Sequence, residues 1–168
     1  KLELLMKQSG VTTDDRRVTV AAKEKAAKTN AISSAIELHD GTIITSKTSA
    51  LLGTSAALIL NAVKHLAGIP HEEKLIPVSM IEPIQNMKVS YLKGNNPRLH
   101  TDEVLIMLSM LSLTDENCQK AIEQLPKLDG CQVHTTVMLS EVDKKIFKKL
   151  GVDVTMESVI KTPNVYKK

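Results

Sequence analysis

Hydrophobic and polar residues alternate over positions 34–39 and again over 42–45, on either side of Asp40 and Gly41. A period of two is typical of a strand with one buried face, and an Asp-Gly pair favours a two-residue hairpin turn. The pattern therefore predicts a β-hairpin. A nearly continuous apolar segment follows it, and this segment predicts a buried helix that begins at Thr48 or Ser49 and ends at Leu66.

The middle of the chain has helical spacing. Apolar residues recur every three or four positions, which predicts helices over 79–92, 101–111 and 114–125. Thr101 is predicted to cap the second of these helices, because Ser and Thr accept hydrogen bonds from the free N–H groups of a first turn.

The last third of the chain is richer in Val and Thr. Residues 132–139 predict a strand, 140–150 a short helix and 152–156 a final strand. Such short connections indicate a right-handed crossover between parallel neighbours. Together with the hairpin, these elements predict an α/β fold of three layers, with a mixed sheet of about four strands and helices on both faces.

The same elements suggest how the chain is organised. Residues 31–160 are predicted to form the α/β domain, with a helical insertion at about 71–126. Residues 1–30 are predicted to be a helical lead-in that belongs to a preceding helical subdomain, and 161–168 to be a basic tail. The chain also begins without Met, inside a helical pattern, so we expect it to be a piece of a longer protein.

Composition excludes some classes of function. The 22 Lys and Arg exceed the 19 Asp and Glu by only three, and the aromatic residues are Tyr91, Phe147 and Tyr166. Proteins that bind single-stranded nucleic acid need a concentrated basic surface and aromatic rings on which bases stack. We therefore expect no nucleic-acid partner.

The predicted location is the cytoplasm. The longest apolar segments, 56–60 and 104–108, are far shorter than the ~20 residues of a membrane-spanning helix, so no membrane partner is expected. Cys118 and Cys131 stand in a chain without a signal-like N-terminus, and we expect two reduced thiols rather than a disulfide.

One candidate site for chemistry lies where the hairpin meets the helix, at Lys47, Thr48 and Ser49. The free N–H groups of a helix N-terminus bind phosphate or carboxylate. No Gly-x-x-x-x-Gly-Lys precedes this point, so a Walker-type phosphate loop is excluded. Helix capping by Thr48 or Ser49 is the simpler alternative, and we favour it.

A second candidate is the polar loop that leads into the helix at 101. Arg98 can bind a carboxylate or phosphate with its planar guanidinium, and His100 titrates near neutral pH. The favoured alternative is that both side chains pair with Asp102, with Glu103 or with an adjoining domain. A small anionic ligand held by Lys47, Thr48, Ser49, Arg98 and His100 is thus a possible partner.

No metal, cofactor or catalytic residue is predicted. Cys131 and His134 are three residues apart on a predicted strand, so their side chains point to opposite faces and cannot share an ion. The sequence also lacks the Gly-x-Ser-x-Gly motif of serine hydrolases.

The order of elements resembles the cytidine-deaminase-like fold. That fold holds zinc with His or Cys and a following Glu at one helix start, and with Pro-Cys-x-x-Cys at another. Here the corresponding positions are 48–51, Thr-Ser-Ala-Leu, and 139–143, Leu-Ser-Glu-Val-Asp. The zinc ligands are absent, so the resemblance implies a layout without deaminase activity.

Several motifs in order resemble the C-terminal region of uncharacterised protein family 0371, also called domain of unknown function 1846. These motifs occupy residues 41–49, 59–70, 96–106, 123–131 and 148–151. The resemblance implies a bacterial protein much longer than this chain, with an N-terminal α/β region of nucleotide-binding appearance and no established activity. The family pattern Thr-x-Glu-Pro-Val-Tyr is replaced at 155–160 by Thr-Met-Glu-Ser-Val-Ile.

Two hypotheses about function follow. The first is a structural C-terminal domain that contributes at most part of a site, packs against the missing N-terminal domain and supports assembly, with a homo-oligomer expected. It follows from the helices over 50–66 and 104–111, which are too apolar for a small domain to cover easily. The alternative is an enzyme domain for a phosphorylated or nucleotide-like metabolite.

Overall fold

A computed structural model describes residues 16–158, so residues 1–15 of the predicted lead-in and the whole of the predicted tail, 161–168, lie outside the described residues. The strands are β1 (Ser33–Glu37), β2 (Ile43–Lys47), β3 (Gln132–Thr135) and β4 (Asp153–Met156). The helices are α2 (Arg17–Thr29), α3 (Thr54–Leu66), α4 (Val78–Asn86), α5 (Thr101–Leu111), α6 (Glu116–Ile122) and α7 (Glu141–Leu150). A π-helical turn, η2 (Met87–Tyr91), continues α4, and a 3-10 turn, η3 (Leu125–Leu128), follows α6.

The predicted hairpin is confirmed, with a longer turn. β1 and β2 are antiparallel, with Ala35 opposite Thr45. The backbone N–H of Gly41 donates to the carbonyl of Leu38, and Gly41 has a φ of 88°. This is a three-residue loop that ends in a left-handed glycine, rather than the predicted two-residue turn.

The predicted mixed sheet is also confirmed. The strand order is β2-β1-β3-β4; β3 is antiparallel to β1 and parallel to β4, and α7 connects the parallel pair. β3 ends at Thr135, four residues before the predicted end at 139, because Thr135 is the last residue in register with β4. Ser140 caps α7 by accepting from the N–H of Asp143, and Gly151 ends it at a φ of 79°.

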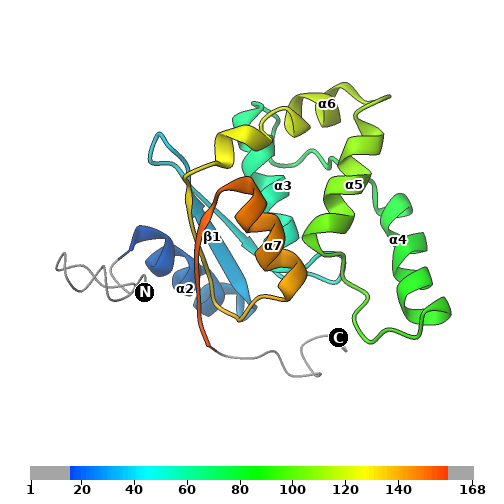
Figure 1. The fold of residues 1–168 in the computed structure, drawn as a ribbon, viewed down its shortest axis with the longest axis horizontal. Coiled ribbons are helices and arrows are strands. Elements are labelled where there is room, and N and C mark those ends of the chain that lie inside the picture. Colours follow the sequence, from blue (N-terminus) through cyan, green and yellow to red (C-terminus); the bar gives the residue numbers. More distant parts are fainter. Residues whose placement is uncertain (1–15, 159–168) are drawn as a thin grey trace.

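The sheet separates two apolar clusters. On one face, Val18 and Ala22 of α2 pack against Ala35. On the other face, the larger core joins α3, α5 and α7 to the sheet, and Phe147 of α7 is one of its fully buried side chains. Figure 1 shows α2 behind the sheet and α7 in front of it, which gives the predicted layers.

The predicted start of the central helix is wrong by about one and a half turns. α3 begins at Thr54, with Gly53 as its N-cap, and not at Thr48 or Ser49. The Ser49 hydroxyl does accept hydrogen bonds from the N–H groups of Leu51 and Leu52, as a capping residue would. The chain then extends to form a parallel bridge between Leu52 and Leu99, so the helix is delayed.

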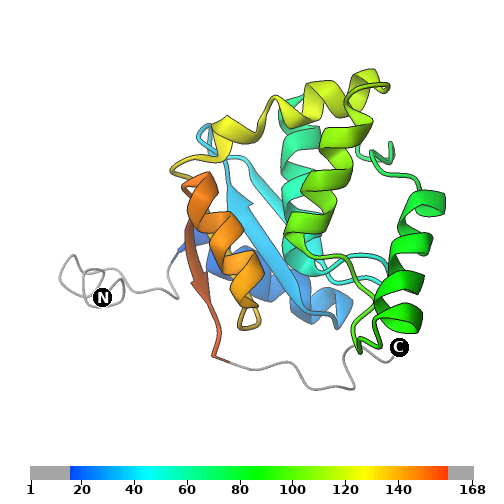
Figure 2. The same ribbon diagram turned by 45° about the vertical axis from the view of Figure 1, so that its right-hand side comes forward.

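The helices between α3 and β3 form the outer part of the molecule. Figure 1 and Figure 2 show that α4 lies on the far side of α5 from the sheet. α5 begins at Thr101 as predicted, but its N-cap is His100. Within residues 16–158, no helix has both the length and the apolar character required to cross a membrane.

Candidate functional site

Two segments predicted to bind an anion lie side by side. The N–H of Leu99 donates to the carbonyl of Leu51 over 3.0 Å, and the N–H of Gly53 donates to the carbonyl of Leu99 over 3.2 Å. Arg98 reaches across this seam, and its Nε donates to the carbonyl oxygen of Ser49. The fold therefore brings together residues that are nearly fifty positions apart in the sequence.

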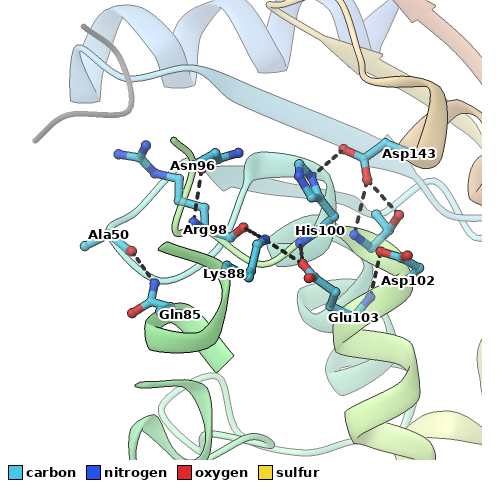
Figure 3. Close-up of polar contacts among 10 residues, drawn as sticks. Ala50, Gln85, Lys88, Asn96, Arg98, His100, Asp102, Glu103 and Asp143 are labelled. Carbon is cyan, nitrogen blue, oxygen red and sulfur yellow. Dashed lines mark hydrogen bonds and ion pairs between the residues drawn. The ribbon is translucent and has the colours of Figure 1, made fainter. Parts of the chain in front are cut away.

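Arg98 is buried, and its surroundings hold it in place. The Nζ of Lys88 donates to the Arg98 carbonyl over 2.6 Å and forms an ion pair with Glu103 at 2.8 Å (Figure 3). Glu103 also accepts the backbone N–H of His100 over 2.7 Å. These contacts join the start of η2 to the start of α5, which indicates a structural role for the Arg98 segment.

His100 faces a different carboxylate from those predicted. Its Nδ1 lies 3.9 Å from Oδ2 of Asp143 on α7, whereas Asp102 and Glu103 were the expected partners. Asp143 is buried, and its Oδ1 accepts from both the N–H and the hydroxyl of Thr101 (Figure 3). The acid therefore caps α5 from a neighbouring helix.

Lys47, Thr48 and Ser49 occupy the free edge of the sheet. The N–H of Thr48 donates to the carbonyl of Ile32, which extends the pairing of β2 with β1. Oγ1 of Thr48 is buried and has no hydrogen-bond partner within the described residues. The exposed Lys47 and Ser49 line a groove of about 590 Å³ along β2.

This groove contains basic residues that the sequence analysis missed. Lys25 lines it from α2, Lys64 and His65 line it from the last turn of α3, and His71 lines it from the loop beyond. They stand on three separated segments, so no local motif brings them together. Arg98 and His100 do not line it.

A second surface stands out because it is apolar and exposed. On α5, Ile106 and Met110 are 61% and 67% exposed, although Val104 and Leu108 on the same helix are fully buried. Exposed apolar side chains also occur on α4, on and just after η2, and just after α5. We call the following set the outer apolar surface: Met80, Met87, Val89, Tyr91, Leu92, Ile106, Met110 and Leu113.

A buried histidine lies on the α2 side of the sheet. Nδ1 of His134 is 2.8 Å from the Thr155 hydroxyl, and Nε2 is 3.1 Å from Oε2 of Glu157. Burial lowers the pKa of His134, although Glu157 opposes this effect. Both ring nitrogens have hydrogen-bond partners, so His134 resembles a structural core histidine more than a catalytic one.

Both cysteines are buried free thiols on the larger core's side of the molecule. Burial raises the pKa of Cys118 to about 11, with help from Asp115, and burial also raises the pKa of Cys131. Raised pKa values disfavour the reactive thiolate. Across residues 16–158, no three His, Cys, Asp or Glu side chains group closely enough to hold a metal ion.

Comparison with known proteins identifies relatives but no activity. A UPF0371 protein of Corynebacterium aurimucosum is 51% identical over 93% of this chain, and one of Corynebacterium urealyticum is 50% identical over all of it. A UPF0371 protein of Streptococcus pyogenes serotype M3 is 45% identical, again over the whole chain. The chain spans 31% to 34% of the length of these relatives.

The family model described as "Domain of unknown function DUF1846, C-terminal" matches residues 14–166. This match covers nearly the whole chain and agrees with the motifs noted in the sequence. The chain therefore belongs to the DUF1846 family and corresponds to its C-terminal domain.

Proposed function

We propose that this chain acts as a structural domain that binds the N-terminal part of the same longer protein through the outer apolar surface. The observation that carries the proposal is α5, which is apolar on two opposite sides. Val104, Met107 and Leu108 face the core, whereas Ile106 and Met110 are exposed. A helix that is apolar all round is normally covered on all sides.

The other apolar helix of the sequence does not need such a partner. Most of α3 is buried, including Leu58, Ile59 and Val63, between the sheet and the outer helices. The prediction that the chain cannot bury the apolar side chains of residues 50–66 by itself is therefore wrong, because α5 and α6 pack over α3. The exposed apolar side chains of the outer apolar surface lie instead on or next to α4, η2 and α5.

The length of the relatives favours one occupant for this surface. About two thirds of each UPF0371 protein lies outside the region that this chain matches. Exposed apolar patches mark binding surfaces, and domains of one chain commonly pack against each other. The N-terminal part of the family protein is thus the partner we propose, within a cytoplasmic bacterial protein.

The contacts around Arg98 support the same role. The Lys88–Glu103 ion pair and the hydrogen bond from Lys88 to the Arg98 carbonyl fasten η2 to the start of α5. Both ends of this connection carry members of the outer apolar surface. A rigid arrangement of the two helices would lower the entropic cost of binding a partner.

Mixing this chain with the separately expressed N-terminal two thirds of the C. urealyticum relative tests the proposal. Calorimetry should show a one-to-one complex, and the double substitution Ile106→Lys with Met110→Lys should weaken it at least about tenfold. The matched control places Lys at two other exposed apolar positions, Val20 and Val142, which lie on α2 and α7. The control should leave the affinity within about twofold.

Two results would contradict the proposal. Equal affinity of the α5 variant and the unchanged chain would remove the outer apolar surface from the interface. Self-association of the chain that Ile106→Lys and Met110→Lys abolish, without binding of the N-terminal part, would assign the surface to a homo-oligomer.

A further inference from the structure

The groove along the free edge of β2 is lined by basic and neutral residues. Its described lining includes three lysines and two histidines and no Asp or Glu. The basic residues are Lys25, Lys47, Lys64, His65 and His71. A concave surface lined by one sign of charge concentrates ligands of the opposite charge.

Lys64 is the residue of the groove that most favours an anionic ligand. Its residue is 8% exposed, and its Nζ donates to the carbonyl of His71 over 2.7 Å. Within residues 16–158 it forms no ion pair within 4 Å; Glu72 and Glu73 act on it only from a greater distance. A buried ammonium without a close counter-ion is costly, and burial accordingly lowers the pKa of Lys64.

The edge strand supplies neutral donors in the same groove. Thr48 donates its N–H to Ile32, and Thr42 accepts the N–H of Leu38, so the even-numbered residues of this edge bond toward the β1 side. Backbone groups alternate in direction along a strand, and the odd-numbered residues between them therefore direct their N–H and C=O groups away from β1. The N–H groups of Thr45 and Lys47 therefore face the groove. The Ser49 hydroxyl already accepts from Leu51 and Leu52 and keeps its hydrogen for donation.

We infer that this groove is a binding site for a small phosphate-bearing anion. Phosphate oxygens accept hydrogen bonds from ammonium, backbone N–H and hydroxyl groups, and all three kinds of donor meet here. The volume of about 590 Å³ is in the range of small-molecule sites. This inference does not depend on the proposed interdomain role, because the groove and the outer apolar surface share no residue.

An added β-strand is a poorer occupant of the same edge. Strand addition requires the outward carbonyls of β2, and Nδ2 of Asn61 already donates to the carbonyl of Thr45 over 3.0 Å. The side chain of Asn61 therefore blocks the middle of the edge. Of the five residues predicted for an anion site, Lys47 and Ser49 line this groove.

Titration of the whole chain with inorganic pyrophosphate, followed by calorimetry and by amide NMR shifts, tests the inference. We expect saturable binding, with shifts concentrated at Thr45, Lys47 and Ser49. Replacing Lys25 and Lys47 together by Gln should weaken binding about tenfold or more, because each ammonium supplies a charge-assisted hydrogen bond. Circular dichroism and the melting temperature establish that the variant is folded.

The matched control removes two exposed lysines from α7, as Lys145→Gln with Lys149→Gln. It makes the same change in net charge and should leave pyrophosphate affinity within about twofold, since these residues are distant from the groove. Absence of saturable binding, or equal weakening by both double variants, would overturn the inference. Tighter binding of a single-stranded oligonucleotide than of pyrophosphate would overturn the assignment to a small ligand.

Discussion

Asp143 on α7 caps α5 through Thr101. Its Oδ1 accepts the Thr101 backbone N–H over 3.1 Å and the Thr101 hydroxyl over 2.7 Å. The two residues are 42 positions apart, and both are buried. The hydrogen bonds tie the strand-helix-strand unit to the outer helices, so this pair helps to position the outer apolar surface.

Loss of this carboxylate should destabilise the protein. Asp143→Ala leaves two buried donors of Thr101 without partners, which we expect to lower the free energy of unfolding by about 2 kcal/mol. Urea denaturation measures the change. Asp143→Asn keeps one acceptor oxygen and should cost less, and Glu141→Ala, an exposed acid in the same helical turn, is the matched control. Equal stabilities of Asp143→Ala and Glu141→Ala would contradict the capping role.

Gly151 and Gly68 offer a comparison of two left-handed glycines. Both have positive φ, 79° and 72°, so alanine is strained at either position. A Cβ at Gly151 would also lie 1.8 Å from Oδ1 of Asp129, whereas a Cβ at Gly68 meets no atom within 4 Å. We expect Gly68→Ala to cost about 1 kcal/mol and Gly151→Ala about 2 to 3 kcal/mol, measured by thermal or urea unfolding. A smaller loss at Gly151 than at Gly68 would show that Asp129 moves away easily.

The two thiols should be inert in the native protein. The pKa of Cys118 is raised to about 11 by burial and by Asp115, and the pKa of Cys131 is raised by burial and by Asp129. At pH 8, Ellman's reagent should therefore react with neither thiol until the chain is unfolded in urea. Rapid reaction of either cysteine without denaturant would contradict the burial described.

His134 should make stability depend on pH. Burial lowers its pKa below the ordinary value of 6.5, so the unfolded chain binds the proton more readily than the folded chain does. The free energy of unfolding should hence fall as the pH drops from 6.5 toward the lowered native pKa. His134→Gln should reduce this slope in urea denaturation measured between pH 5 and 8. The same slope in the variant would assign the pH dependence to other groups.

The sequence predicted correctly those elements whose turns and caps depend on residues close together in the chain. The hairpin, α7 and the parallel pair follow from the Asp40-Gly41 turn, the Ser140 cap and the Gly151 stop, each of which acts within a few residues. The start of α3 was mispredicted because Ser49 makes cap-like hydrogen bonds, while the bridge from Leu52 to Leu99 keeps the chain extended. That bridge joins distant segments and has no local signature.

The site was less predictable for the same reason. Asp102, Glu103 or an adjoining domain were the partners predicted for Arg98 and His100. In the fold His100 faces Asp143, and Arg98 also donates to the Ser49 carbonyl. The basic groove takes Lys25 and Lys64 from two helices on either side of β2. Only the packing of those helices reveals it. The deaminase-like layout and the boundary of the helical insertion stay predictions.

Hydrogen exchange of this chain, alone and with the N-terminal two thirds of the C. urealyticum relative, tests the interdomain role most directly. The account predicts that the partner slows amide exchange in η2 and in α5, from Ile106 to Leu113, and leaves α2 unchanged. Binding with unchanged exchange in α5 and slower exchange elsewhere would contradict the claim that the outer apolar surface is the interface.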